Sequence, residues 1–184
     1  MSDVAQRYRR AAARFTQRAS EVMPDAWEAP APCEGWVARD VVRHMVEWMP
    51  AFLMAAGGPP LPIGPSVDDD PVGAWVTMSD GIQALLDDPA AAALPLRHPQ
   101  AGSHALADAV GMFFLGDVVI HTWDLARATG LDETLDPEEV SAMLAGLQPM
   151  DEVLRSSGHY GPKVAVPPDA DEQTQLIAFT GRQP

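Results

Sequence analysis

The sequence contains a single cysteine, Cys33. One thiol allows neither a disulfide framework nor a zinc cluster built from several thiolates of one chain. This cysteine usage is typical of a protein from a reducing compartment. The N-terminal residues, MSDVAQRYRRAAARF, carry arginines throughout and no apolar segment, so we expect no signal peptide and a cytoplasmic location.

Basic residues are also scarce. The chain has 12 Lys and Arg against 26 Asp and Glu, which gives a formal net charge of −14. This charge repels phosphate backbones and anionic membrane surfaces, so we expect no nucleic-acid partner and no membrane partner. We also find no run of about 20 apolar residues of the kind that a membrane-spanning helix needs. The expected partner is therefore a small-molecule substrate.

Alternation of polar and apolar residues with period two is nearly absent, whereas helical spacings of three and four recur. The 184 residues suit a single domain over residues 1–184. The apolar spacing predicts long helices over 3–23, 37–57, 69–87 and 103–129, with an irregular segment over 88–102. Shorter helices are expected over 137–149, 150–157 and 170–180. This pattern predicts an all-α protein, a four-helix bundle with short extra C-terminal helices.

The longest predicted helix carries two polar residues within an apolar segment. The stretch GDVVIHTWDLARATG begins at Gly116, and its Asp117 and His121 are four residues apart. This spacing places both side chains on one face of a helix. The apolar residues around them indicate that this face is buried. A buried carboxylate without a partner costs several kcal/mol. Asp117 and His121 must therefore form a hydrogen bond with each other or share a further partner.

Two interpretations of this pair are open. The first is a direct hydrogen bond between Asp117 and His121 in a metal-free bundle, because buried polar groups are usually paired. The second is a divalent metal site completed from a facing helix. His44, in the stretch VVRHMVEW, borders the apolar face of the second predicted helix and is the candidate third ligand. Two imidazoles and one carboxylate are a ligand set of catalytic zinc sites, and they also suit Fe²⁺ or Ni²⁺.

Other polar side chains have less specific signals. Three roles are open for Glu47: a fourth metal ligand, a general base or, as the simplest interpretation, a solvated charge. Asp124 either accepts a hydrogen bond from an imidazole or forms an ion pair with Arg127. Cys33 is interpreted as structural and Trp36 as part of the core. The remaining histidines, His98, His104 and His159, are assigned surface or structural roles.

Three stretches together resemble a known family. They are PCEGWVARDVVRHMVEW, GDVVIHTWDLARATG and YGPKVAVPPDADEQTQLIAFTGRQP, in that order along nearly the whole chain. They are similar to actinobacterial metal-binding proteins of the DinB-like superfamily, a group that resembles the N-terminal domain of mycothiol-dependent maleylpyruvate isomerase. The resemblance implies a four-helix bundle with one divalent metal, usually zinc, held by the residues that correspond to His44, Asp117 and His121. It also implies mycothiol as a thiol cosubstrate, and homodimer formation.

Departures from the family pattern limit what the resemblance implies. Asp117 stands where the isomerase commonly has Glu, and Val37 stands where relatives often have Ser or Thr as a helix cap. We also expect the second domain of the isomerase to be missing, so maleylpyruvate isomerisation itself is not carried over. The leading hypothesis is a metal-dependent thiol transferase or isomerase that acts on a small electrophile. The alternatives are a metal-dependent hydrolase and a non-catalytic bundle that binds metal or dimerises.

Overall fold

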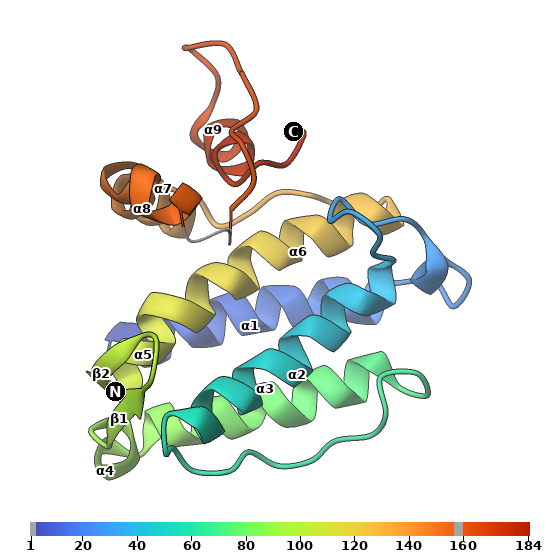
Figure 1. Cartoon of the computed structure of the whole chain (residues 1–184). Coiled ribbons are helices and arrows are strands. Elements are labelled where there is room, and N and C mark those ends of the chain that lie inside the picture. Colours follow the sequence, from blue (N-terminus) through green and yellow to red (C-terminus); the bar gives the residue numbers. More distant parts are fainter. Residues whose placement is uncertain (1–2, 157–159) are drawn as a thin grey trace.

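The computed structural model describes residues 3–156 and 160–184 of the chain. Four long helices form its main body: α1 (Asp3–Glu21), α2 (Ala38–Ala55), α3 (Pro71–Asp87) and α6 (Leu115–Thr129). α1 packs against α3 and α6, and α2 packs against the same two helices, so the four helices close around one core (Figure 1). The predicted four-helix bundle is confirmed.

The core forms because each long helix presents an apolar stripe to its neighbours in the bundle. On α1, residues such as Tyr8 and Phe15 are fully buried at helical spacing. Phe15 packs against Trp75 of α3, with 4.4 Å between the ring centroids. In α6, every residue from Val118 to Ala126 is buried, so the helix is enclosed on nearly every side there and most of these residues are apolar.

Aspartates define the starts of several helices. Asp70 precedes α3, and its carboxylate accepts a hydrogen bond of 2.8 Å from the backbone N–H of Gly73. α2 begins differently, because the Val37 side chain provides no cap for the helix. The Asp40 carboxylate instead accepts a hydrogen bond of 3.0 Å from the Val37 backbone N–H. This contact fixes the entry of the chain into α2, one of the two helices that carry the site.

The segment between α3 and the central helix differs from the prediction. It contains the short helix α4 (Pro89–Ala92) and an antiparallel hairpin of β1 (Pro95–His98) and β2 (Gly102–Ala105). The expectations of irregular structure over 88–102 and of a helix from residue 103 were therefore wrong, and the helix begins at Leu106. Strands of four residues are too short to show a period of two in the sequence, and in β1 only Leu96 is buried.

A continuous helical run extends from Leu106 to Thr129. It consists of α5 (Leu106–Ala109), a π-helical segment (Val110–Phe114) and α6. By length and composition alone this run could cross a membrane, which the sequence analysis did not expect, but most of it is buried inside the bundle. Its place among the other bundle helices accounts for its apolar sequence.

The C-terminal helices lie together beyond α6 (Figure 1). They are α7 (Pro137–Leu147), α8 (Asp151–Ser156) and α9 (Glu172–Phe179), and α7 packs against α9. Short 3₁₀ turns occur at Ala26–Glu28 and Gln148–Met150. These elements confirm the predicted C-terminal helices. The predicted end at residue 157, and His159, lie outside the described residues.

Candidate metal centre

α2 and α6 bring the three predicted ligands together. Nε2 of His44 lies 3.2 Å from Oδ2 of Asp117, and Nε2 of His121 lies 3.4 Å from Oδ1 of the same carboxylate. One donor atom from each residue lies within 4.8 Å of the other two. Around a tetrahedral zinc with bonds of roughly 2.0–2.1 Å, neighbouring ligand atoms are about 3.3 Å apart. The donor types and their spacing therefore fit a divalent cation.

The cluster lies at the border between core and solvent. The His121 side chain is 6% exposed, whereas those of His44 and Asp117 are 31% and 25% exposed. His121 is thus anchored in the core, and the two other side chains face outward. Two of the three donor side chains are therefore partly accessible to solvent.

Two tryptophans contact the cluster directly. Trp48 donates its indole N–H to Oδ2 of Asp117 at 2.8 Å. The Trp36 ring stacks on His121, with 5.9 Å between centroids, and lies 5.2 Å from the His44 ring. Trp36 is half-buried, so the interpretation as part of the core missed its contact with the site. The reason is that a bridge between Pro30 and Val37 folds its loop back, which the local sequence pattern does not reveal.

Asp124 lies on the opposite side of the His121 ring. Its Oδ2 is 2.8 Å from Nδ1 of His121, and the Asp124 side chain is fully buried. The Arg182 guanidinium donates to both Asp124 oxygens at 2.7 Å. Arg127 pairs instead with Glu133. Of the two alternatives for Asp124, the structure therefore has the hydrogen bond with an imidazole, and Arg182 is a partner that sequence reasoning missed.

A second group of donors, formed by Cys33, His121 and Asp124, meets the same distance criterion. Arg182 lies against it, with Nη2 at 3.4 Å from Sγ of Cys33. A guanidinium that contacts the carboxylate and the thiol together disfavours a cation there, because like charges repel. The Nε2 side of His121 is therefore the better cation site.

The charges of the cluster shift the pKa values of its members. Burial alone would lower the pKa of His121, but the charges and hydrogen bonds of Asp117 and Asp124 outweigh burial and raise the pKa to about 9. Burial opposes ionisation of Asp117 too, yet His121 and His44 hold the pKa of that carboxyl well below its usual range. The two carboxylates therefore stabilise a positive charge on His121.

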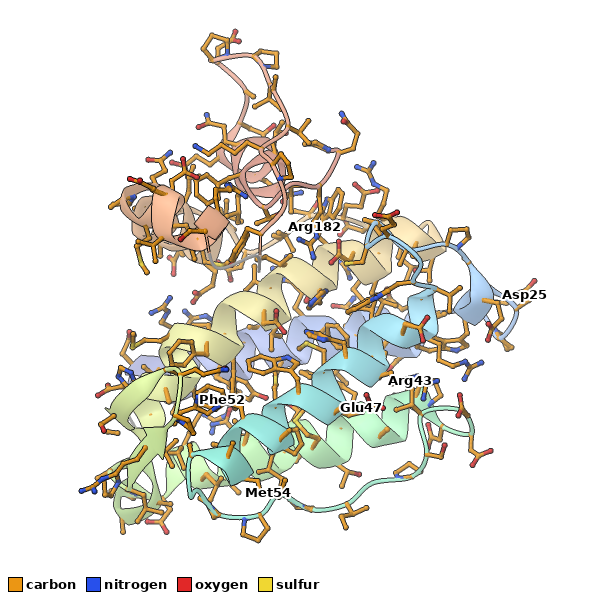
Figure 2. The ribbon with its side chains drawn as sticks, in the orientation of Figure 1. Asp25, Arg43, Glu47, Phe52, Met54 and Arg182 are labelled. Atoms are coloured by element: carbon orange, nitrogen blue, oxygen red, sulfur yellow. The ribbon has the colours of Figure 1, made fainter. Side chains whose placement is uncertain are left out.

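The other described polar residues singled out in the sequence have different surroundings. Glu47 is exposed on the surface of α2 (Figure 2). His98 stacks on Phe52 with 4.4 Å between centroids, and His104 contacts the backbone carbonyl of Ala101 at 2.8 Å. Burial and the nearby Asp124 charge raise the pKa of Cys33 to about 11, so its thiol stays protonated at neutral pH.

This arrangement defines a class of protein, a helical bundle with two imidazoles and one carboxylate converging from two helices. Comparison with known proteins agrees with that class. A family model described as the mycothiol maleylpyruvate isomerase N-terminal domain matches residues 8–126. The match covers more than half of the chain, so the protein belongs to this family.

Two mycobacterial relatives match this chain over nearly its full length. Uncharacterized protein MT0763 of Mycobacterium tuberculosis strain CDC 1551 / Oshkosh is 29% identical to this chain over 202 residues. Uncharacterized protein Rv0738 of strain ATCC 25618 / H37Rv shows the same identity over the same length. Each alignment covers 95% of this chain and 95% of the relative. No solved structure matches the chain.

Proposed function

We propose that this protein binds a divalent cation, zinc in the first place, at His44, Asp117 and His121. We further propose that the site serves a thiol-dependent transfer or isomerisation of a small electrophile. The observation that carries the proposal is the convergence of three donor atoms from α2 and α6 within 4.8 Å of one another. Membership in a mycothiol-related family supports mycothiol as the thiol.

The number of converging donors supports an open site. Closed structural zinc sites have four protein ligands, whereas catalytic sites have three and an open position. Glu47 is exposed, and Asp124 contacts the other nitrogen of the His121 ring. Neither residue supplies a fourth donor in this arrangement. A non-catalytic metal staple is therefore less well supported than a reactive centre.

The protein residues around the centre prepare it for a ligand. A bound divalent cation lowers the pKa of a thiol or water at its open position, which supplies a nucleophile at neutral pH. Trp48 orients the Asp117 carboxylate, and Asp124 orients the His121 ring. Trp36 shields His121 on one ring face. The outward side of His44 and Asp117 leaves an approach for the cosubstrate.

Metal analysis of untagged protein, purified without chelators and then reloaded with zinc, tests the metal site. We expect about one equivalent of zinc per chain, lost in His44→Ala and in His121→Ala because two ligands hold zinc poorly. His104→Ala in the hairpin is the matched control and should retain zinc. Wild-type protein that holds no zinc after reloading would contradict the proposal. If the protein retains Fe²⁺ or Ni²⁺ in preference to zinc, the proposed site stands and the proposed metal changes.

Calorimetric titration with mycothiol tests the thiol. We expect mycothiol to bind the zinc-loaded protein and not the metal-free protein, because the open metal position is the proposed thiol site. Equal binding to both forms, or to neither, would contradict a thiol-dependent function while leaving the metal site in place. Hydrolysis of test esters by the loaded protein without thiol would favour the hydrolase alternative.

A further inference from the structure

A buried ion pair joins the C-terminal segment to the candidate metal centre. Arg182 follows α9, and its guanidinium contacts both oxygens of Asp124 at 2.7 Å. Asp124 has no exposed surface. A carboxylate in such a setting needs charged or hydrogen-bonding partners to stay ionised. Arg182 and His121 are those partners, so together they fix where the carboxylate lies.

We propose that Arg182 is a positioning residue for metal binding, which acts on His121 through Asp124. The inference rests on the metal site proposed above. Oδ2 of Asp124 lies 2.8 Å from Nδ1 of His121 and accepts a hydrogen bond from Arg182 at 2.7 Å. A proton held on Nδ1 by this carboxylate leaves the lone pair of the ring on Nε2, which faces Asp117. Arg182 thereby helps to select the form of His121 that can bind a cation.

The backbone conformation before Arg182 places its side chain toward Asp124. Gly181 has a φ of +90°, and a Cβ there would lie 3.1 Å from the carbonyl oxygen of Pro162. Glycine is therefore favoured at this position. The Arg182 N–H donates to the carbonyl of Ile177 at 3.2 Å, which closes the end of α9. Figure 2 shows Arg182 where the C-terminal segment meets α6.

Arg182 also contacts the loop before α2. Its Nη2 lies 3.4 Å from Sγ of Cys33, and the same loop carries Trp36 against the His121 ring. The guanidinium thus joins the C-terminal segment, the loop and α6 around one histidine. Metal affinity should therefore depend on how the C-terminal segment is seated.

Zinc affinity of the full chain, measured by competition with a chromogenic chelator, tests this role. Arg182→Gln removes the charge, and we expect its zinc Kd to rise roughly 10- to 100-fold, the range typical of lost partners of metal-binding histidines. Arg182→Lys keeps the charge but not the two-pronged contact, so a smaller loss is expected. Arg127→Gln is the control. It removes an exposed ion pair on α6, the helix that carries Asp124 and His121, and should leave the zinc Kd unchanged.

A double-variant cycle separates positioning from general loosening. If Arg182 acts through Asp124, Arg182→Gln combined with Asp124→Asn weakens zinc binding no more than Asp124→Asn alone. A merely structural role predicts a lower unfolding temperature of the metal-free protein with an unchanged Kd in the folded protein, and that result would overturn the inference. Losses that multiply in the double variant would also overturn it.

The remaining outcomes are equally decisive. If Arg182→Gln does not fold, Arg182→Lys is judged by the same two criteria. Wild-type protein without zinc affinity would overturn the metal site and the positioning role together. Normal wild-type affinity with an unchanged Kd in the folded variants would overturn the positioning role alone.

Discussion

Nε2 of His121 lies 3.4 Å from Oδ1 of Asp117, one helical turn earlier on α6. Its other nitrogen, Nδ1, lies 2.8 Å from Oδ2 of Asp124. The ring is therefore placed between two carboxylates in a largely buried setting. Such a position stabilises a positive charge on the ring or next to it, and either a proton or a metal cation at Nε2 can provide that charge. Proton and metal compete for the same nitrogen.

Zinc affinity should consequently depend on pH well above the range of an ordinary histidine. The pKa of His121 is raised to about 9, so below that pH zinc must displace a proton from the ring. The raised pKa also means that the charge of His121 stabilises the metal-free protein fully below about pH 6.5, and that this stabilisation is lost as pH rises through about 9. We expect zinc affinity to increase with pH over this interval and then to level off.

Calorimetry in buffers of different ionisation enthalpy measures the proton release directly. Near pH 7.5 about one proton per zinc should be released from His121. Asp124→Asn removes one of the two charges that raise the pKa, so it should release fewer protons at the same pH. A zinc affinity that is constant between pH 6.5 and 9 would contradict this assignment of His121.

The indole of Trp48 should contribute to metal binding through Asp117. Trp48→Phe keeps an aromatic ring on α2 but removes the N–H that lies 2.8 Å from Oδ2 of Asp117. We expect the zinc Kd to rise about 10-fold, because an unoriented carboxylate must be ordered on binding. Chelator competition measures the change.

Trp75→Phe is the matched control for this substitution. Trp75 donates a hydrogen bond of the same length, 2.8 Å, to Thr16, but it lies in the core between α1 and α3. Its replacement should lower the unfolding temperature and leave the zinc Kd unchanged. Equal effects of the two substitutions on the Kd would show that the Trp48 contact has no specific role.

The bundle could be predicted from the sequence because its signals are local. Apolar spacing of three and four marks each long helix, and a spacing of four places Asp117 beside His121 on one face. The proximity of His44 required only that two apolar faces meet. The hairpin was missed because its strands have four residues each, too few to show alternation.

The contact of Asp124 with Arg182, unlike its hydrogen bond with His121, could not be predicted in the same way. Arg182 is 58 residues away in the chain and follows α9, a different helix, so no helical spacing relates the two. The nearer Arg127, three residues after Asp124, pairs with Glu133 instead. Trp36 illustrates the same limit, because its ring reaches the site only after the loop folds back on itself. Side chains placed by loops depend on tertiary packing, which local patterns do not encode.

The ion pair between Arg7 and Glu139 should contribute strongly to stability. It links α1 to α7, and the Glu139 side chain is only 2% exposed. Nη2 of Arg7 lies 2.8 Å from Oε2 of Glu139, whereas Arg10 is farther away at 3.5 Å. Arg7→Met keeps the apolar stem but leaves the buried carboxylate with the weaker partner. We expect a loss of about 2–3 kcal/mol in the free energy of unfolding.

Urea denaturation followed by circular dichroism measures this loss, with Arg9→Met as control. Arg9 pairs with Asp87, and the two side chains are 43% and 39% exposed, so its replacement should change the free energy of unfolding by less than about 1 kcal/mol. The cost of Arg7→Met arises from an unpaired buried charge, so adding Glu139→Gln should recover most of the loss. A double variant as unstable as Arg7→Met alone would show that the unpaired charge of Glu139 does not account for the loss.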